Sequence, residues 1–302
     1  MMKNSNKVSI IITTYDGLDN IERAVKSTLV QTYKNIEVIV VDDNGYGTDK
    51  QKETKKILSK WIESEKITYI AHEHNKNGSA ARNTGWKASA GKYICFLDDD
   101  DYYMPEKVQE EVKLFENANE EIQLVFCGIL HRKNGFPDRE EIAADLQYDL
   151  FTEFRFRMLP VCSSTIMVRR DRLERIGGFD ESFARHQDWE CIARILMDGG
   201  LALNVRKALV VKEQIGRNIP SNAKKTENCS NFFLKKMEPL IVKQTAKHQR
   251  KIYFDAYLLT AKVYFDEYNM KKVIEYSIKS KRPVYLFLRA AWHHYKKINN
   301  KF

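Results

Sequence analysis

Apolar residues in the first hundred positions follow two alternating patterns, continuous runs and runs with helical spacing. Continuous runs rich in β-branched residues predict strands that are buried on both faces. Such strands are predicted at Val8–Thr13, Ile36–Val41, Ile67–Ala71 and Tyr93–Leu97. Apolar residues three and four positions apart predict helices between them, at residues 21–29, 50–63 and 79–90. Asn20 stands where the first helix needs its N-cap, and Gly91 is expected to end the third helix.

The alternation of strands and helices predicts an α/β fold with a mostly parallel, Rossmann-like central sheet that is flanked by helices. Ligands of such sheets bind at the carboxyl ends of the strands. Three polar segments follow predicted strands at that edge, namely Thr13, Asp42-Asp43 and Asp98–Asp101. We therefore expect these side chains, which are far apart in the sequence, to meet in one site.

The alternating pattern continues to about residue 212 and then changes. Helices are predicted at 106–117, 170–176 and 189–197, and strands at 124–130, 161–168 and 209–212. Gly177-Gly178 is expected to close the second of these helices. The polar stretch 216–225 predicts a loop, and 226–302 predicts helices only. The chain is thus expected to hold an α/β domain at 1–222 and a helical region at 223–302.

The composition narrows the class of protein. The chain has 302 residues, 43% of them hydrophobic, and its 13 Gly and 6 Pro argue against collagen-like or disordered chains. No apolar run approaches the roughly 20 residues of a membrane-spanning helix, and the apolar stretch Val8–Ile12 is too short for a signal peptide. Five scattered cysteines without a zinc-binding spacing are typical of reduced thiols. We therefore expect a cytoplasmic protein.

Positive charge is concentrated toward the C-terminal end. The net charge is +9, and residues 223–302 carry 18 Lys and Arg against 6 Asp and Glu, a balance of +12. A basic helical surface can meet an anionic membrane, an acidic polymer or nucleic acid, or it can simply stay solvated. Composition alone leaves these alternatives open.

Asp98–Asp101 is the most informative motif for chemistry. Four adjacent carboxylates repel one another, so the cluster needs a counter-charge. A divalent cation supplies it, and oxygen ligands select Mg²⁺ or Mn²⁺. Such a cation also binds diphosphate oxygens and neutralises a leaving group. The alternative is that some of these aspartates only cap the helix that follows Pro105.

Two further segments offer nucleotide and phosphate contacts. The Asp43 carboxylate can accept hydrogen bonds from a base or a ribose, whereas Asp42 fits a role in shaping the turn. Thr13 adds a hydroxyl, and Tyr15 adds a ring. Arg82 lies near the start of a helix, where free N–H groups bind phosphate, and it either adds charge there or forms an internal ion pair. Neither a G-x-G-x-x-G motif nor a P-loop is present, which argues against dehydrogenases and P-loop NTPases.

Asp188, in the segment His186–Glu190, is a candidate catalytic base. It precedes an apolar helix, so helix capping is the competing explanation. His186 and Glu190 are weaker candidates of the same kind. No Ser, His and Asp residues form a recognisable nucleophilic triad.

These motifs together resemble glycosyltransferase family 2, a large family of inverting, nucleotide-sugar-dependent enzymes with the GT-A fold. The resemblance is carried by VSIIITTYDGLDNIERAVKSTLVQTYKNIEVIVVDDN, NGSAARNTGWKASAGKYICFLDDDDYYMP, TIMVRRDRLERIGGFDESF and QDWECIARIL. It covers roughly residues 7–215, in the family's order and spacing. It implies a GT-A catalytic domain with a nucleotide-sugar half at about 1–105 and an acceptor half at about 106–222, followed by the helical appendage.

The resemblance also implies donor contacts and a metal. The residues that would contact the nucleotide sugar are Thr13, Tyr15, Asp43, Arg82, Asp98 and Asp99. The first three of these would line the uridine pocket. Asp98–Asp100 would form the Asp-x-Asp element, in which Asp100, together with Asp98, holds Mn²⁺ or Mg²⁺. UDP is the commonest nucleotide in the family, so a UDP-sugar is the expected donor.

The reaction implied by the resemblance is a single displacement. Asp188 would take the proton from an acceptor hydroxyl as that oxygen attacks the anomeric carbon, which gives a β-linkage from an α-linked donor. The acceptor would be a glycan or a lipid-linked glycan in bacterial surface polysaccharide synthesis. Gln187 departs from the pattern, because an acid commonly precedes the base, and the first strand ends in Thr-Thr-Tyr-Asp instead of Pro-Thr-Tyr-Asn. Arg217 is a candidate for a basic residue that reaches the diphosphate.

Two other functions remain compatible with the residues. A nucleotidyltransferase that makes sugar nucleotides would use a similar sheet and metal, although it typically opens with a Gly-rich, basic loop that this chain lacks. A non-catalytic glycan- or RNA-binding protein led by the basic region is the second, although aromatic residues at helical spacing there predict core packing. We expect no nucleic-acid partner, and we expect the basic region to contact the anionic inner face of the membrane or an assembly partner.

Overall fold

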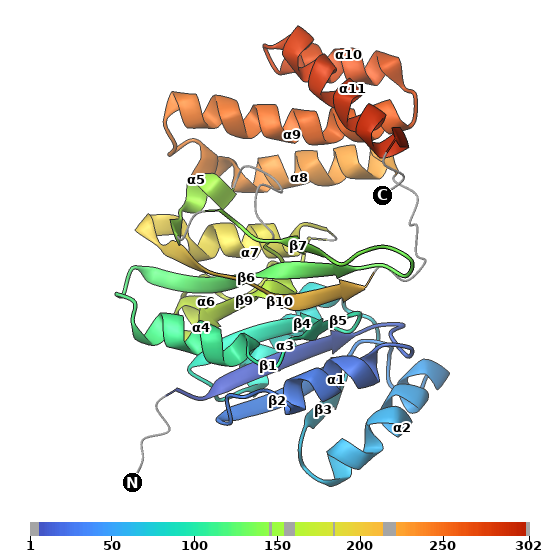
Figure 1. The fold of residues 1–302 in the computed structure, drawn as a ribbon, viewed down its shortest axis with the longest axis vertical. Helices are drawn as coiled ribbons and strands as arrows, with labels where there is room; N and C mark the ends of the chain where they lie inside the picture. Colours follow the sequence, from blue (N-terminus) through green and yellow to red (C-terminus); the bar gives the residue numbers. More distant parts are fainter. Residues whose placement is uncertain (1–5, 145–146, 154–160, 184, 214–221, 300–302) are drawn as a thin grey trace. The chain divides into compact units, whose positions relative to one another are not determined.

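The computed structural model of the chain describes residues 6–144, 147–153, 161–183, 185–213 and 222–299 (Figure 1). The chain divides into two compact units. The first, which we call the α/β unit, comprises residues 1–150 and 159–216. The second, the helical unit, comprises residues 151–158 and 217–302.

Ten strands of the described chain form one mixed sheet, in the order β3-β2-β1-β4-β9-β6-β10-β5, with β7 beside β6 and β8 beside β10. The strands are β1 (Val8–Thr14), β2 (Ile36–Asp42), β3 (Thr68–Ala71), β4 (Tyr93–Asp98), β5 (Asp101–Tyr103), β6 (Ile122–Arg132), β7 (Arg139–Glu141), β8 (Gln147–Tyr148), β9 (Ile166–Arg169) and β10 (Leu201–Glu213). β1 is parallel to both β2 and β4, and β2 is parallel to β3. β9 is antiparallel to its neighbours β4 and β6, and β6 and β10 are parallel again. The predicted α/β fold is confirmed. In its N-terminal half the paired strands among β1–β4 are all parallel.

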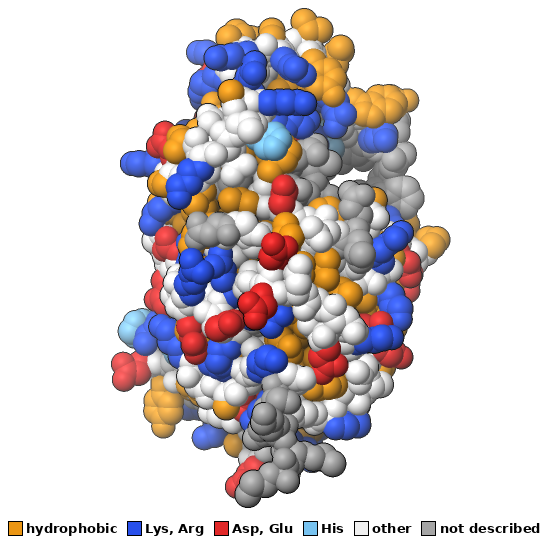
Figure 2. Space-filling model, turned by 90° about the vertical axis from the view of Figure 1, so that its left-hand side faces the viewer, with side chains coloured by type: hydrophobic (Ala, Val, Ile, Leu, Met, Phe, Trp, Pro, Cys, Tyr) orange, Lys and Arg blue, Asp and Glu red, His pale blue; other side chains and the backbone are white. Residues whose placement is uncertain are grey.

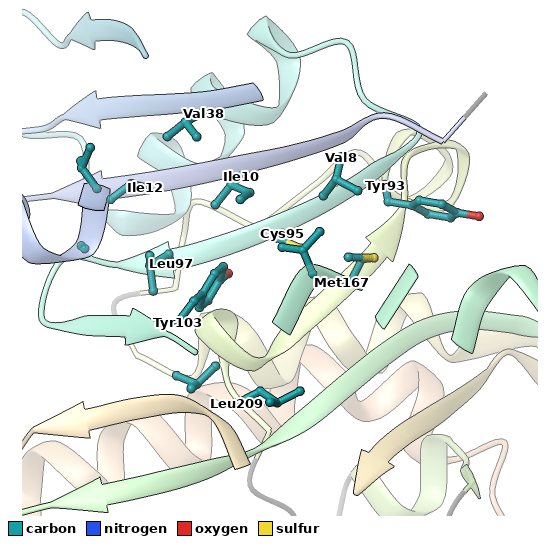
Figure 3. Close-up of a cluster of buried hydrophobic side chains, with 14 of the residues drawn as sticks. Val8, Ile10, Ile12, Val38, Tyr93, Cys95, Leu97, Tyr103, Met167 and Leu209 are labelled. Atoms are coloured by element: carbon teal, nitrogen blue, oxygen red, sulfur yellow. The ribbon is translucent and has the colours of Figure 1, made fainter. Parts of the chain in front are cut away.

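Helices cover both faces of this sheet, and alternate strand residues point to opposite faces. The helices of the α/β unit are α1 (Ile21–Leu29), α2 (Asp49–Glu63), α3 (Gly78–Ala88), α4 (Lys107–Glu116), α6 (Arg170–Ile176) and α7 (Gln187–Ile195). The short α5 (Leu150–Glu153) has its first residue in this unit and its other three in the helical unit. Ile10 and Ile12 pack in the cluster that includes α1, α2 and α4, part of which Figure 3 shows. Ile11 packs in the cluster that includes α3, α6 and α7. Burial on both faces explains the continuous apolar runs of the sequence.

Two helix ends differ in detail from the prediction. Asn20 occupies the N-cap of α1, but its side chain accepts from Arg23 Nη2 and does not cap the helix. Helix α3 ends at Ala88 with Ser89 as its C-cap, so Gly91 is not the helix stop. A Cβ at Gly91 would stand 2.4 Å from Ser9 Oγ, and the glycine is therefore needed for close packing against β1.

The second half of the sheet also departs from the predicted boundaries. Residues 163–165 form a 3₁₀ turn, η1, so the strand predicted at 161–168 begins only at Ile166. The side chain of Ser164 in η1 hydrogen-bonds Asp101, which a regular strand would not permit. The strand predicted at 209–212 is the end of the longer β10. Helix α6 ends as predicted, with Gly177 in the left-handed region at φ 75°.

The helical unit consists of helices in its described part, which confirms the predicted helical appendage. They are α8 (Ala223–Ile241), α9 (Ala246–Asp266), α10 (Met270–Lys279) and α11 (Pro283–Asn299). Helix α8 begins inside the stretch 216–225, for which the sequence predicts a loop. The first part of that stretch, with Arg217, lies outside the described residues. None of the helices in the described chain has both the length and the apolar composition that crossing a membrane requires.

Glu227 joins three helices of this unit. The residue is 4% exposed. Its carboxylate accepts hydrogen bonds from the Tyr264 hydroxyl at 2.8 Å and the Tyr276 hydroxyl at 2.7 Å. It also pairs with Lys224 and Lys272. Burial acts to raise the pKa of Glu227, but these four donors outweigh it and lower the pKa to about 2.

We therefore expect Glu227→Gln to destabilise the helical unit in a pH-dependent way. A carboxylate whose pKa is depressed stabilises the fold above its unfolded pKa and loses that effect as the pH falls toward 2. The free energy of unfolding should drop by about 2 kcal/mol at pH 7 and by much less at pH 3. Urea unfolding followed by circular dichroism measures both values. Glu275→Gln, which removes a more exposed ion-paired carboxylate, is the control, and an equal loss for Glu227→Gln at both pH values would contradict this account.

Candidate active site

The carboxyl ends of β1, β2 and β4 lie side by side, as the sequence predicts. Thr13 in β1 is paired with Val41 in β2 and with Asp98 in β4. Thr14 is paired with Asp42 at the end of β2. The polar residues that end these three strands therefore share one edge of the sheet.

Arg82 on α3 connects this edge to the second half of the α/β unit. Its Nη2 donates to Asp98 Oδ1 at 2.5 Å and to Ser163 Oγ at 3.1 Å. Its Nη1 donates to Gln187 Oε1 at 3.0 Å. Burial acts to raise the pKa of Asp98, but Arg82 and Lys212 outweigh burial and hold that pKa below its usual range. The structure thus shows the internal ion pair of Arg82, and a contact of Arg82 with phosphate stays a prediction.

Asp99 is held against the end of β1. Its Oδ2 accepts from Thr14 Oγ1 at 2.6 Å and from the Tyr15 N–H at 3.2 Å. A Cβ at Gly17 would stand 1.8 Å from that same oxygen, so the turn after β1 needs a glycine here. Burial and the two neighbouring aspartates raise the pKa of Asp99 to about 7, against the effect of the Thr14 hydrogen bond.

Asp100 and Asp101 have contrasting surroundings. Asp100 is exposed, and no described residue hydrogen-bonds its carboxylate or pairs with it. Asp101 is 2% exposed and accepts from Ser164 Oγ at 2.6 Å and from Lys212 Nζ at 2.5 Å. Burial raises the pKa of Asp101 to about 6, although Lys212 acts to lower it. Asp100 is thus the carboxylate of the run that has no bonded partner within the described chain.

The acidic run fits a divalent cation. Carboxylate oxygens of Asp98, Asp100 and Asp101 lie within 4.8 Å of one another. Arg82 pairs with Asp98 and Lys212 pairs with Asp101, whereas Asp99 and Asp100 have no cationic partner within the described chain. Oxygen donors and uncompensated charge are what Mg²⁺ and Mn²⁺ select. The predicted ligands Asp98 and Asp100 belong to this cluster, and Asp101 joins them as a carboxylate that Lys212 already neutralises.

Asp43 is buried and orders the segment that leads into α3. Its Oδ1 lies 2.7 Å from His72 Nδ1 and accepts from the Lys76 N–H at 2.8 Å. Its Oδ2 accepts from the N–H of Asn77, the N-cap residue of α3. Asp42 accepts from the Asn44 N–H, which is the turn role expected for it. A contact between Asp43 and a base or ribose stays a prediction.

Thr13 and Tyr15 lie at the same edge of the sheet. Thr13 is half-buried, and Tyr15 is 59% exposed. Within the described chain, neither side chain has a hydrogen-bond partner. Both are therefore available to a ligand, which is what the predicted donor contacts require.

Asp188 lies in the first turn of α7, beside Gln187 and so next to the Arg82 contact. The N-cap position belongs to His186, whose ring stacks on Trp189 with centroids 4.3 Å apart. Burial raises the pKa of Asp188, and the positive charge of Arg82 opposes that rise. Asp188 is thus placed near the charges of the acidic run. Its Oδ1 also accepts from the Trp189 N–H at 3.0 Å, so a role at the start of the helix and the role of catalytic base both stay open.

Lys212 and Ser163 are part of this arrangement and were not predicted from the sequence. Lys212 pairs with Asp101 in the register between β10 and β5. A lysine at the end of the apolar run LVV was the available signal, because such a residue needs a carboxylate when the strand is buried. Ser163 gave no signal, since its position depends on the 3₁₀ turn η1.

The fold and site define a glycosyltransferase of the GT-A class, and comparison with known proteins gives the family. Residues 9–177 match the model of the family described as Glycosyl transferase family 2. This match covers more than half of the chain, which therefore belongs to that family. The nucleotidyltransferase and the non-catalytic binder that remained open from the sequence are not supported.

Curated relatives are glycosyltransferases as well. An uncharacterized glycosyltransferase of Rickettsia prowazekii is 29% identical over 80% of this chain and 76% of its own length. The amylovoran biosynthesis glycosyltransferase AmsB of Erwinia amylovora is 26% identical over 78% of this chain and 79% of its own length. WfaP of Escherichia coli is 41% identical over 36% of this chain and 41% of its own length. The chain spans 34% of a longer relative in Rickettsia bellii.

Solved structures with the same fold include S. aureus TarS 1-349 in complex with UDP, at a TM-score of 0.58 and 15% identity, covering 97% of this chain and 92% of that one. A mannosyltransferase of Pyrobaculum calidifontis in complex with GDP-Man and Mn²⁺ has a TM-score of 0.59 and 18% identity, covering 96% of this chain and 87% of that one. These similarities support the GT-A fold. GT-A neighbours of this chain thus bind nucleotide sugars and a metal ion.

The ion pair of Arg82 and Asp98 is expected to be energetically coupled. Because both groups are largely buried, Arg82→Gln should lower the free energy of unfolding by about 3 kcal/mol in metal-free buffer. Asp98→Asn should lower the free energy of unfolding less in the Arg82→Gln background than in the unaltered chain. The difference, which is the coupling energy, should be at least ~1 kcal/mol. A double-mutant cycle by urea unfolding measures this coupling. The exposed pair Arg132 and Asp138 is the matched control, for which the coupling should stay below ~1 kcal/mol, and additivity at the buried pair would contradict the account.

Proposed function

We propose that the chain transfers a sugar from a nucleotide-diphosphate donor, a UDP-sugar, to a hydroxyl of a glycan or lipid-linked acceptor, with inversion at the anomeric carbon. One observation carries the proposal. Arg82 hydrogen-bonds both Asp98 in the acidic run and Gln187 beside Asp188. The same guanidinium therefore joins the donor residues of the first half to the candidate base of the second half.

The donor diphosphate would bind at the acidic run. Asp98 and Asp100 would hold Mn²⁺ or Mg²⁺, which when bound supplies charge that binds phosphate oxygens and stabilises a leaving diphosphate. Arg82 would stabilise the ionised state of Asp98, so that this carboxylate remains a ligand at neutral pH. Asp99, held by Thr14, would line the sugar side of the donor.

The nucleoside would occupy the ends of β1 and β2. Tyr15 offers an exposed ring for packing against the base, and Thr13 offers a hydroxyl. Asp43 would accept a hydrogen bond from the base or the ribose, because a carboxylate has more acceptor sites than its three internal partners occupy. The choice of UDP follows the family and the name of WfaP, which gives UDP-Glc as the donor of that enzyme.

Asp188 would act as the general base. Its carboxylate takes the proton of the acceptor hydroxyl, the oxygen forms a bond to the anomeric carbon, and the bond to the diphosphate breaks with its electron pair on the leaving oxygen. Burial supports this role, because it raises the pKa of Asp188 and so strengthens the base. Inversion follows from attack on the face opposite the leaving group.

The acceptor would be part of a surface polysaccharide. AmsB is named for amylovoran biosynthesis, and WfaP for transfer onto a diphosphoundecaprenol-linked GlcNAc. We assign catalysis to residues 1–222, with the donor half at about 1–105 and the acceptor half at about 106–222, and a membrane-facing role to 223–302. This places the enzyme at the inner face of the cytoplasmic membrane.

Helix α11 supports the membrane contact. One face of it carries apolar side chains that are each more than half exposed, namely Val284, Leu288, Trp292 and Tyr295. Arg289 and Lys296 lie beside this stripe, and Figure 2 shows Lys and Arg next to hydrophobic side chains over the helical unit in the upper part of the view. An exposed apolar stripe with aromatic residues and flanking cations is typical of helices that lie on anionic membranes.

Asp188→Asn is expected to keep donor binding and lose transfer. The amide cannot take the proton, so the rate should fall by about 10²–10⁴-fold while the donor dissociation constant stays within about twofold. Release of UDP and product formation are measured after a screen of UDP-, GDP- and dTDP-sugars with Mn²⁺. Asp171→Asn, an exposed change on α6, is the control. Retained transfer by Asp188→Asn, or a product with the donor's anomeric configuration, would contradict the proposal.

Asp100→Asn is expected to abolish the Mn²⁺ dependence of donor binding with little effect on stability. The carboxylate is exposed and has no bonded partner in the described chain, so its loss should change the free energy of unfolding by less than ~0.5 kcal/mol. Calorimetric titration of UDP with and without Mn²⁺ gives the test. Asp49→Asn, another exposed carboxylate, should leave the Mn²⁺ effect intact. An unchanged Mn²⁺ effect in Asp100→Asn would exclude this residue as the ligand.

The double change Leu288→Ser and Trp292→Ser is expected to weaken binding to anionic vesicles about tenfold, because it removes two apolar side chains from the exposed stripe. Cosedimentation with vesicles of phosphatidylglycerol and phosphatidylcholine measures the effect. The matched control is Val30→Ser with Tyr46→Ser, which removes exposed apolar side chains from the α/β unit. Equal binding by both double variants would remove α11 from the proposed contact.

A further inference from the structure

The helical unit contains a cavity of its own, with a volume of about 1100 Å³. Its walls are the first turns of α9, the connection between α10 and α11, and Phe151 of the same unit. The side chain of Phe151 stacks on His248 at the start of α9, with ring centroids 3.6 Å apart. A cavity of this size is at the upper end of those that bind small molecules and short oligomers.

Five cationic side chains that have no carboxylate partner among the described residues line this cavity. They are Lys247, Arg250, Lys251, Lys281 and Arg282. No ion pair joins any of them to a carboxylate among the described residues, and no described acidic residue lines the cavity. By contrast, Lys279 at the rim pairs with Glu275 at 2.7 Å, and Lys272 of the same helix pairs with Glu227.

The five cations give this cavity a positive electrostatic potential. Like charges that gather around one hollow repel one another, and their potentials add there. The N-terminal turn of α9 adds the positive end of a helix dipole to the same wall. An anionic ligand with several charges would neutralise the cluster, and phosphate groups suit Lys and Arg donors best.

Aromatic rings form the other part of the lining. They are Phe151, Tyr253, Phe254, Tyr257 and Tyr285. Tyr285 is 49% exposed and stacks on the buried Phe254, with ring centroids 5.6 Å apart. About half of the surface of Tyr285 is therefore accessible beside the cations. Such faces pack against rings of a ligand, while the tyrosine hydroxyls serve as hydrogen-bond donors or acceptors.

We propose that this cavity binds a phosphate-bearing glycan, with phosphate groups among the five cations and sugar rings against the aromatic side chains. The ligand class rests on the proposed function, because a glycosyltransferase handles saccharides. A concave site favours a discrete chain of rings over a flat membrane surface. The same phosphosaccharide can arrive free in solution or attached to a lipid, and the two sources share this chemistry.

Binding of a phosphorylated maltodextrin to the full chain tests the proposal, by calorimetry without donor or metal. Under these conditions the transfer reaction plays no part, so its failure would not affect the result. The variant Arg250→Gln, Lys281→Gln, Arg282→Gln should bind at least tenfold more weakly than the unaltered chain. The matched control is Lys225→Gln, Lys235→Gln, Lys271→Gln, which removes the same charge from exposed positions outside the cavity and should change the affinity less than threefold. Unphosphorylated maltodextrin should not bind.

Two further arms separate the other sources of phosphate. Polyuridylate tests RNA, and phosphatidylglycerol vesicles test a lipid headgroup. The proposal would be overturned if the unaltered chain does not bind the phosphorylated maltodextrin while the cavity variant loses its binding to vesicles or to RNA. Equal weakening by the cavity and control variants would also overturn it, because it would show that only net charge matters.

Tyr285→Ala tests the rings without changing the charge. It should lower the affinity for the phosphorylated maltodextrin at least threefold. The affinity for inorganic polyphosphate, which has no rings, should change less than twofold. Equal loss for both ligands, or no loss for either, would contradict a role for the aromatic wall. Thermal unfolding by circular dichroism shows whether each variant retains the fold.

Discussion

The partly buried ion pair between Arg82 and Asp98 is the interaction on which the arrangement of the site depends. It joins α3 to the end of β4, and the same guanidinium reaches Ser163 in η1 and Gln187 at the start of α7. A buried pair of this kind contributes little net stability, because desolvation opposes the attraction. The pair instead fixes the positions of the two side chains, since separating them would leave an uncompensated charge in the interior. Helix α3 and the end of β4 are thereby joined to η1 and α7, which come much later in the sequence.

The second constraint is the mutual repulsion of the acidic run. The four aspartates have different surroundings. Asp98 pairs with Arg82, and Asp101 pairs with Lys212. Asp99 accepts a hydrogen bond from the Thr14 hydroxyl, and Asp100 is exposed to solvent. Only two of these four carboxylates, Asp98 and Asp101, pair with a cation among the described residues. A site that is under-compensated in this way is prepared for an added cation. Asp100, the exposed carboxylate of the run, is the one that we propose as a direct ligand of the divalent ion.

Much of this organisation could be predicted from the sequence, because strands buried on both faces leave continuous apolar runs. The ends of these runs predict that Thr13, Asp42 and Asp98 share one sheet edge, and the pairing of β1 with β2 and β4 confirms it. Contacts that depend on the three-dimensional path of the chain could not be predicted in the same way. The role of Lys212 requires the register of β10 against β5, and the role of Ser163 requires a 3₁₀ turn where the apolar pattern predicts a strand.

Gly91 and Asp43 show a second limit of sequence reasoning. Gly91 was expected to end a helix, but close packing against Ser9 explains it, and this contact has no local sequence signature. Asp43 was predicted to face a ligand, yet its oxygens also hold His72 and the segment before α3. The contacts of Asp43 within the described chain support the fold, and its contact with a ligand stays a prediction. Residue type alone does not separate these two demands.

The most direct test of the account is a crystal structure of the chain with Mn²⁺ and UDP, with the ion located by its anomalous scattering. The account predicts an anomalous peak in coordination contact with carboxylate oxygens of Asp98 and Asp100, with phosphate oxygens of UDP on the same ion. The Asp188 carboxylate should face the open side of that diphosphate. A peak away from the acidic run, or UDP bound elsewhere than at the ends of β1, β2 and β4, would contradict the central claim.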